Sequence, residues 1–264
     1  MKPPKRYPSK ALANILHRTP FSILRFLEDK AQFHLGKGSG SNSTSIEAKA
    51  IAYFANELNF KEIFALDVGG NLGNWTAELK REIPSAKIVI FEPSKEAFGH
   101  LQARFAHFND VECVNSALGK ANKIATLFSD KSASGLASLT KRRVEHFGID
   151  FSYEEEINIS TLDWWISNEE LVHRPNVLKM DVEGHELDVL QGATKALENI
   201  AIIQFEFGGS NIDTRTYFQD FWYFFQEKGF DLHRLTPRGS ILIGHYSEND
   251  EVFRPTNYIA VRNF

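Results

Sequence analysis

The sequence predicts an α/β fold with a mostly parallel sheet covered by helices on both faces. Short apolar runs alternate with segments of helical spacing from about residue 63 to residue 228. Such alternation is typical of βαβ units, in which each crossover helix packs on the sheet. Two apolar runs end in an acidic residue, Asp67 and Glu92, at strand ends where open parallel sheets bind ligands. The 264-residue chain is long enough for one such domain and an appendage.

The first forty residues are basic, with eight Lys or Arg against two acidic residues. Apolar residues between positions 12 and 27 have helical spacing that Pro20 interrupts. We therefore predict a basic helical arm and linker over residues 1–45, with a mobile Gly- and Ser-rich stretch from residue 36. The arm is expected to pack on its own domain or on a second subunit in a homodimer. Contact with an anionic membrane surface is the alternative.

The composition argues against several classes of protein. A net charge of −4 does not indicate a nucleic-acid surface. No stretch approaches the roughly 20 apolar residues of a membrane span, and Arg18 and Pro20 interrupt any signal peptide. The single cysteine, Cys113, is compatible with a reducing compartment. We expect a cytoplasmic protein, at the inner face of the membrane if the arm binds lipid.

The domain is predicted to span residues 46–264 and to begin with a helix over 46–58. Residues 120–160 break the alternation and are expected to form an insertion over the carboxyl edge of the sheet. Three short strands with tight turns are expected near 230–235, 241–246 and 258–261. The remaining expected elements are strands near 63–67, 87–91, 111–114, 176–180 and 200–206, and helices near 73–82, 94–107, 185–197 and 214–228.

The loop after the first strand carries the sequence Asp67-Val68-Gly69-Gly70-Asn71-Leu72-Gly73-Asn74. A dinucleotide-binding loop needs glycine at 69, 71 and 74, but two of these positions are Asn, so NAD or FAD is weakly supported. Asn is the residue other than glycine that best adopts a left-handed backbone, so Asn71 can replace a central glycine. The pattern Asp-x-Gly-x-Asn-x-Gly resembles motif I of class I S-adenosylmethionine-dependent methyltransferases.

A second segment extends this resemblance. The run from Lys179 to Glu186, followed by Val189-Leu190-Gln191-Gly192, resembles the Lys-x-Asp-x-Glu-Gly-x-Glu…Val-Leu-x-Gly signature of FkbM-type methyltransferases. Glu92-Pro93, the run from Asn115 to Gly119 and the run from Thr161 to Asp163 fit the same family in order. The resemblance implies a Rossmann-like class I methyltransferase fold, with seven mostly parallel strands and an antiparallel final strand. It also implies O-methylation of a sugar, glycolipid, glycan or related natural product.

Carboxylates are expected to gather at the sheet edge, because Asp67, Glu92, Asp181 and Glu206 all end strands. Buried carboxylates need a partner, and the cationic S-adenosylmethionine would supply one. Glu92 would hold the ribose, and Ser116 and Ala117 would border the adenine. The full expected cofactor set is Asp67, Gly69, Gly70, Asn71, Gly73, Asn74, Thr76, Glu92, Pro93, Ser116, Ala117 and Asp181.

The end of the fourth strand supplies the candidate catalytic residues. Lys179, Asp181 and Glu183 alternate at period two and would face the transferring methyl group, or form a structural ion pair. An alcohol acceptor needs a base, and Asp181 is the first candidate, with His185 and Glu206 behind it. Asp181, Glu183 and Glu206 could instead hold a divalent metal, although no zinc-type spacing supports one. A non-catalytic, cofactor-binding scaffold is the alternative to an enzyme.

Overall fold

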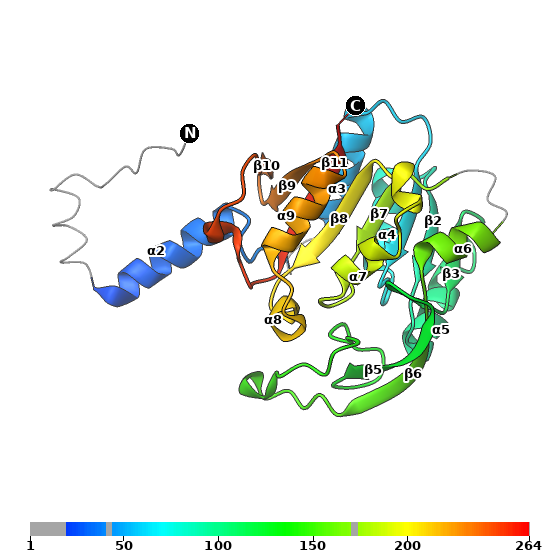
Figure 1. The fold of residues 1–264 in the computed structure, drawn as a ribbon, viewed down its shortest axis with the longest axis horizontal. Coiled ribbons are helices and arrows are strands. Elements are labelled where there is room, and N and C mark those ends of the chain that lie inside the picture. The colour runs from blue at the N-terminus through cyan, green and yellow to red at the C-terminus, as the bar shows by residue number, and fades with distance from the viewer. Residues whose placement is uncertain (1–19, 41–43, 170–173, 264) are drawn as a thin grey trace.

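The computed structural model describes residues 20–40, 44–169 and 174–263. Its main sheet has eight strands in the order β10-β9-β11-β8-β7-β1-β2-β3 (Figure 1). The fold class implied seven strands; the sheet has an eighth because the short strand expected near 241–246 pairs at its edge as β10. Parallel pairing joins β1 (Phe64–Val68), β2 (Lys87–Phe91), β3 (Val111–Val114), β7 (Val177–Met180) and β8 (Ile202–Phe207).

The last strand of the chain runs against its neighbours, as expected. β11 (Thr256–Arg262) is inserted antiparallel between β8 and β9 (Phe230–Thr236), and β10 (Gly239–Leu242) folds back on β9. The strand expected at 241–246 is therefore shorter and begins earlier, because the turn after Thr236 sets the hairpin register.

Helices cover both faces of the sheet. One core lies under α6 (Leu162–Asn168), α7 (Glu186–Gln191) and α9 (Phe218–Glu227). The other core lies under α3 (Thr44–Glu57), α4 (Asn74–Glu82) and α5 (Lys95–Phe105). Side chains of a strand alternate between the two cores: Leu66 and Val68 pack in the first and Ala65 in the second, so Asp67 points toward the α3 and α4 side.

The helix expected over 185–197 ends at Gln191. A Cβ on Gly192 would lie 2.0 Å from the carbonyl oxygen of Gly119, so the chain turns here against that backbone. A short 3-10 turn, η3 (Ala196–Glu198), follows. The helix expected over 214–228 corresponds to α9, which begins later at Phe218, and a separate short helix, α8 (Ser210–Thr214), precedes it.

The insertion forms a small sheet of its own, with strand order β4-β6-β5. It consists of β4 (Ala117–Leu118), β5 (Lys123–Ser129) and β6 (Tyr153–Ser160), with the turn η2 (Glu145–Phe147) in the long loop between the last two. Figure 1 shows this sheet below α7 and α8, apart from the main sheet. The loop from residue 130 to 140 reaches back toward the ends of β1 and β7.

The N-terminal part of the chain differs from the expected mobile linker. Helix α2 (Phe21–His34) projects from the domain and has no buried residue (Figure 1). Leu35 to Gly40 are fixed instead: Arg234 Nε donates to the Leu35 carbonyl at 2.8 Å, and Gly38 N donates to Thr256 Oγ1 at 2.9 Å. Residues 1–19 and 41–43, which hold the rest of the expected arm and linker, lie outside the described residues. Within the described chain, no helix combines the length and apolar composition needed to cross a bilayer.

Candidate functional site

The loop between β1 and α4 has the left-handed backbone that its sequence predicts. Gly69, Asn71 and Gly73 have φ values of 75°, 47° and 75°. A Cβ on Gly69 would lie 2.0 Å from the carbonyl oxygen of Asp181. Glycine is therefore required here because the loop packs against the end of β7; Gly69, expected to let the backbone approach a ligand, also lines the pocket described below.

A buried ion pair supports this loop from below. Lys179 Nζ lies 3.0 Å from Asp67 Oδ1 and donates to the Gly69 carbonyl at 3.1 Å. Thr76 Oγ1 donates to the other Asp67 oxygen at 2.7 Å. Burial lowers the pKa of Lys179, but the Asp67 and Asp181 carboxylates more than offset this effect and raise it above the ordinary value. Lys179 therefore remains charged and joins β1, β7 and the loop.

Glu92, at the end of β2, holds the loop from the other side. Its two carboxylate oxygens accept from Asn71 N at 2.8 Å and Ser94 N at 2.9 Å. Asn115 donates through Nδ2 to the carbonyls of Glu92 and Pro93, at 2.9 and 3.0 Å. Burial raises the pKa of Glu92. The contacts with Asn71 and Ser94 hold the Glu92 carboxylate in place at the edge of the sheet, where it lines a pocket.

This pocket lies between the ends of β1, β2, β4 and β7 and the insertion. It brings together eight of the predicted site residues: Gly69, Asn71, Glu92, Pro93, Ala117, Asp181, Glu183 and His185. The insertion and nearby strands complete it with Val68, Leu118, Leu127, Ser134, Gly135, Ala137, Ser138, Leu139 and Val182.

The other predicted site residues do not line the pocket but lie around it. Asp67, Thr76 and Lys179 form the support beneath the loop, where Gly70 and Gly73 also pack. Asn74 Oδ1 accepts from Arg104 Nη1 at 2.8 Å, which turns its side chain to the outside. Ser116 Oγ donates to the Ala117 and Asn158 carbonyls. Glu206 is half-buried at the end of β8.

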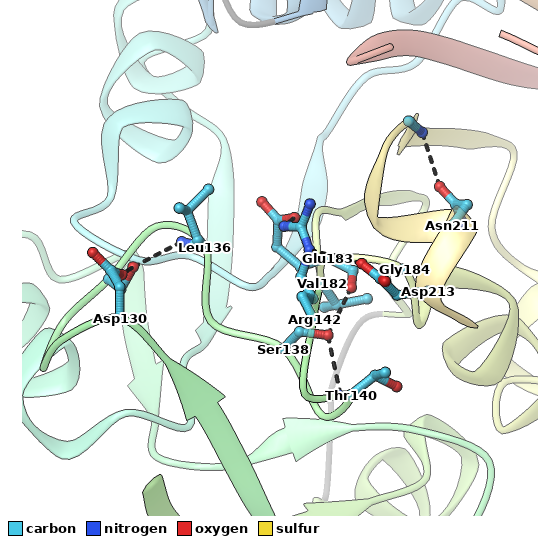
Figure 2. Close-up of polar contacts among 12 residues, drawn as sticks. Asp130, Leu136, Ser138, Thr140, Arg142, Val182, Glu183, Gly184, Asn211 and Asp213 are labelled. Atoms are coloured by element: carbon cyan, nitrogen blue, oxygen red, sulfur yellow. Dashed lines mark hydrogen bonds and ion pairs between the residues drawn. The ribbon is translucent and has the colours of Figure 1, made fainter. Parts of the chain in front are cut away.

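The insertion is attached to the pocket by specific polar contacts. Ser138 Oγ donates to the Glu183 carbonyl at 2.8 Å, and Asn71 Nδ2 donates to the Ser134 carbonyl at 3.2 Å. Figure 2 shows Arg142 beside Glu183 and Asp213, which come from the β7–α7 loop and from α8. Arg142 Nη1 lies 2.6 Å from Glu183 Oε2, and its Nε lies 3.5 Å from Asp213 Oδ2. The guanidinium thus links three separate segments of the chain.

Burial and neighbouring acids disfavour the ionised form of several carboxylates around the pocket. Burial and the Asp181 carboxylate raise the pKa of Glu183, and Arg142 opposes them. Burial and the neighbouring acids, Asp181 and Glu183 first, raise the pKa of Glu206 well above its ordinary value. Burial raises the pKa of Glu186 to about 7, although its Oε1 accepts from the backbone of Val182 at 2.9 Å. A cation bound here would relieve this repulsion.

His185 is held at both ring nitrogens. Nδ1 lies 2.8 Å from Asp188 Oδ2, and Nε2 lies 3.0 Å from the Thr140 hydroxyl of the insertion. The other Asp188 oxygen pairs with Lys120 Nζ at 3.1 Å. The hydrogen bond with His185 lowers the pKa of Asp188, so this carboxylate is ionised. His185 thus lines the pocket in a fixed orientation.

Sequence reasoning missed Glu47, which α3 buries against the sheet. Its oxygens accept from Gln204 Nε2 at 2.6 Å and Asn257 Nδ2 at 2.8 Å, and Trp75 Nε1 donates to Gln204 Oε1 at 2.8 Å. Gln204 is the register neighbour of Lys179, so this network continues the buried polar row of the site. Burial raises the pKa of Glu47 to about 7. The burial of Glu47 could have been predicted from its position one helical turn before Ile51, on the apolar face of the helix.

Arg142, Thr140 and Lys120 were missed as well, because their partners are distant in the sequence and no local pattern marks them. Asp188 was also missed, although it lies only three residues after His185, a helical spacing that could have indicated the pair. As for metal ligands, the described residues contain no group of three or more His, Cys, Asp or Glu side chains arranged to hold an ion.

Comparison with known proteins gives matches centred on the same segments. A sequence model of the methyltransferase FkbM domain matches residues 67–232. "Methyltransferase 1" of Beauveria bassiana is 27% identical over 143 residues, which cover 49% of this chain and 57% of that protein. The hexuronic acid methyltransferase AglP of Haloferax volcanii is 32% identical over 143 residues, 52% of each protein. The chain thus spans about half the length of these relatives.

A solved structure, the precorrin-6y C5,15-methyltransferase of Geobacter metallireducens, is similar over 81% of this chain and 88% of that chain. The TM-score is 0.44 and the sequence identity is 10%.

Proposed function

Since the chain belongs to the FkbM methyltransferase family, we propose that it is an S-adenosylmethionine-dependent O-methyltransferase. Its acceptor is a hydroxyl of a sugar, glycan, glycolipid or related natural product. One observation carries the proposal: the carboxylates of Glu92, Asp181 and Glu183 border one pocket beside a left-handed loop.

The residues present fit this cosubstrate. Three carboxylates near the strand ends, those of Glu92, Glu183 and Glu206, have raised pKa values because of burial. Their ionised forms are therefore disfavoured without a cation nearby. When bound, S-adenosylmethionine brings an ammonium and a sulfonium, and the sulfonium makes its methyl group electrophilic. An uncharged or anionic ligand would leave these acids uncompensated.

Each element of the pocket has a proposed part in binding. Glu92, fixed by Asn71 and Ser94, accepts hydrogen bonds from the ribose hydroxyls. Ala117 and the apolar side chains of the insertion border the adenine. Asp181 balances the positive charge of the methionine part. The Asp67–Lys179 pair holds the loop that forms the floor.

A relative supports a sugar-type acceptor, and the site supports methylation of a hydroxyl. One matched protein is named a hexuronic acid methyltransferase. In-line methyl transfer to an alcohol needs alignment and a base within hydrogen-bond reach. The pocket offers both carboxylates and an oriented histidine. A divalent metal is not part of this proposal, and a scaffold without activity remains the rival reading.

The proposal extends to the surroundings of the enzyme. Phe21, Phe26 and Leu27 of α2 are exposed, and α2 also carries basic residues. We propose that a second subunit or an anionic membrane surface covers this helix, with the domain from about residue 46 facing the cytoplasm.

A screen of acceptors tests the function. The protein would be incubated with S-adenosylmethionine and the methyl glycosides of glucuronic acid, galacturonic acid, glucose and galactose. We expect mass spectrometry to show the gain of one methyl group that survives mild base, since an ether resists hydrolysis. A base-labile product would instead be a carboxylate ester. Ester formation, or no product from any acceptor, would contradict the proposed O-methylation of a hydroxyl.

A further inference from the structure

A chain of four polar side chains touches the pocket at one member and runs to the surface. It consists of Thr140, His185, Asp188 and Lys120, with successive contacts of 3.0, 2.8 and 3.1 Å. Of these four residues, His185 lines the pocket. An imidazole between a hydroxyl and a carboxylate is the arrangement that activates an alcohol in many enzymes.

We infer that His185 is the catalytic base of the proposed methyl transfer and that Asp188, paired with Lys120, is its positioning residue. This inference rests on the proposed function and assigns the proton-accepting group within it. It places the base on the N-terminal end of α7 rather than on the carboxylate at the end of β7.

The hydrogen bonds assign the protonation of the imidazole. Asp188 is ionised, because its contact with His185 lowers its pKa, and it can only accept. Nδ1 must therefore carry a hydrogen and donate it. In a neutral ring Nε2 then carries no hydrogen, so it is the acceptor of the contact with the Thr140 hydroxyl, 3.0 Å away. This Nδ1–H tautomer, with an unprotonated Nε2, is the state that a base requires.

The competing acids are less well arranged for this role. Asp181 is exposed, so water solvates its carboxylate. Glu206 lies outside the pocket lining, and burial together with its acidic neighbours favours its protonated form. The His185 side chain has only 15% of its surface exposed and is held from two directions. A base held in this way loses little entropy when the acceptor arrives.

In this step the acceptor hydroxyl displaces the Thr140 hydroxyl from Nε2. Once the acceptor takes that place, its proton passes to Nε2 as its oxygen bonds to the methyl carbon. The methyl–sulfur bond breaks at the same time, and its electron pair stays on sulfur. The positive charge that leaves the sulfonium thus appears on the imidazolium, where Asp188 stabilises it.

Two variants and one spectrum test the assignment. With methyl β-D-glucuronide as the acceptor, we expect His185→Gln to lower kcat by about 100-fold or more. The affinity for S-adenosylhomocysteine should stay within about twofold of the native value, because the base acts on the acceptor. His100→Gln is the matched control, since His100 also faces a carboxylate, Glu96, but on the exposed surface of α5.

Asp188→Asn should lower kcat by about tenfold or more with little change in KM, and Asp188→Glu should recover part of the loss, because tautomer and orientation are what Asp188 supplies. Nitrogen NMR of the protein with S-adenosylhomocysteine should show Nε2 of His185 without a proton. In Asp188→Asn the ring proton should move from Nδ1 to Nε2.

Native kcat in His185→Gln, or a proton on Nε2 in the native protein, would overturn the inference. If S-adenosylhomocysteine does not bind the native protein at all, the proposed function itself fails, and the two failures are thereby told apart.

Discussion

The ion pair of Asp67 and Lys179 shows how a single residue can support a site without lining it. Both side chains are almost completely buried, and the pair joins two strands and the loop above them. Moving two charges out of water is costly. Removing only one of them costs more stability still, because the other charge is then left buried without a partner. The two residues therefore act as one structural unit.

Replacing Lys179 with Met should destabilise the protein by about 3–5 kcal/mol, because Asp67 is left charged and buried. The double variant Asp67→Asn with Lys179→Met should recover a substantial part of that loss. Urea unfolding measures both, with Lys87→Met at the exposed start of β2 as the control. Additive losses in the double variant would show that the two side chains do not form a coupled pair.

Glu47 gives the protein a specific dependence on pH. Its pKa is about 7 in the folded state, against an ordinary value of 4.5 in an unfolded chain. The folded state binds more protons between these values, so stability falls as the pH rises from about 4.5 to 7 and is constant above.

Glu47→Gln should remove this component. The stability of the native protein relative to the variant should therefore decrease between pH 5 and pH 8, by up to about 3 kcal/mol. Chemical unfolding at both values measures the difference. Glu57→Gln, at the exposed end of the same helix, should show no such change. A difference that grows with pH would contradict the assigned pKa direction.

At the scale of elements, the strands of the parallel sheet could be predicted closely and the helices less so. β1, β2 and β3 start and end within one residue of their expected bounds. For β1 and β2 the reason is that buried parallel strands are nearly continuous apolar runs. α7 ended early because of a backbone contact between Gly192 and Gly119, which no local pattern reveals. β10 was placed too late because its register depends on the turn before it.

The same distinction holds within the site. The left-handed backbone of Asn71 follows from its residue type, and the carboxylates at the strand ends follow from the strand pattern. The partners of His185 and Glu183 could not be predicted, since Thr140 and Arg142 come from the insertion, where no motif fixes the chain.

Arg142 is one of the residues that hold the insertion to the main domain, so Arg142→Met should loosen it. Glu183 would lose its ion pair, and the backbone bonds between Phe128 and Ser138 should open more often. Hydrogen exchange at these two amides should quicken by about tenfold or more. Exchange within the β5–β6 ladder, at Leu127 for example, should not change. Arg143→Met, an exposed neighbour, is the control, and equal protection in both variants would refute this role for Arg142.

At the scale of the whole molecule, the described part of the N-terminal region consists of two segments of different kinds. α2 has no buried residue, whereas α3 contributes Ala48, Ile51 and Phe54 to the core. Each buried side chain of this size costs about 2–5 kcal/mol when it is lost. The division between arm and domain is therefore expected between α2 and α3.

Two truncated chains test this division. A protein that starts at residue 35 should unfold cooperatively, because it keeps α3 and the residues that bind Arg234 and Thr256. A protein that starts at residue 58 should not, because the core under α3 is exposed. Both lack α2, so thermal unfolding followed by circular dichroism isolates the contribution of residues 35–57. Cooperative unfolding of the shorter chain would contradict this boundary.

The most direct test of the central claim is calorimetric titration of the purified protein with S-adenosylmethionine, S-adenosylhomocysteine and NAD. We expect the first two to bind with dissociation constants of about 1 μM to 100 μM, or −8 to −5 kcal/mol, and NAD not to bind. Gly69→Ala should abolish both, because its Cβ would meet the Asp181 carbonyl at 2.0 Å, while Gly99→Ala, which meets no atom within 4 Å, should bind normally. Binding of NAD alone, or no binding of either sulfur compound by protein shown to carry no ligand from purification, would contradict the account.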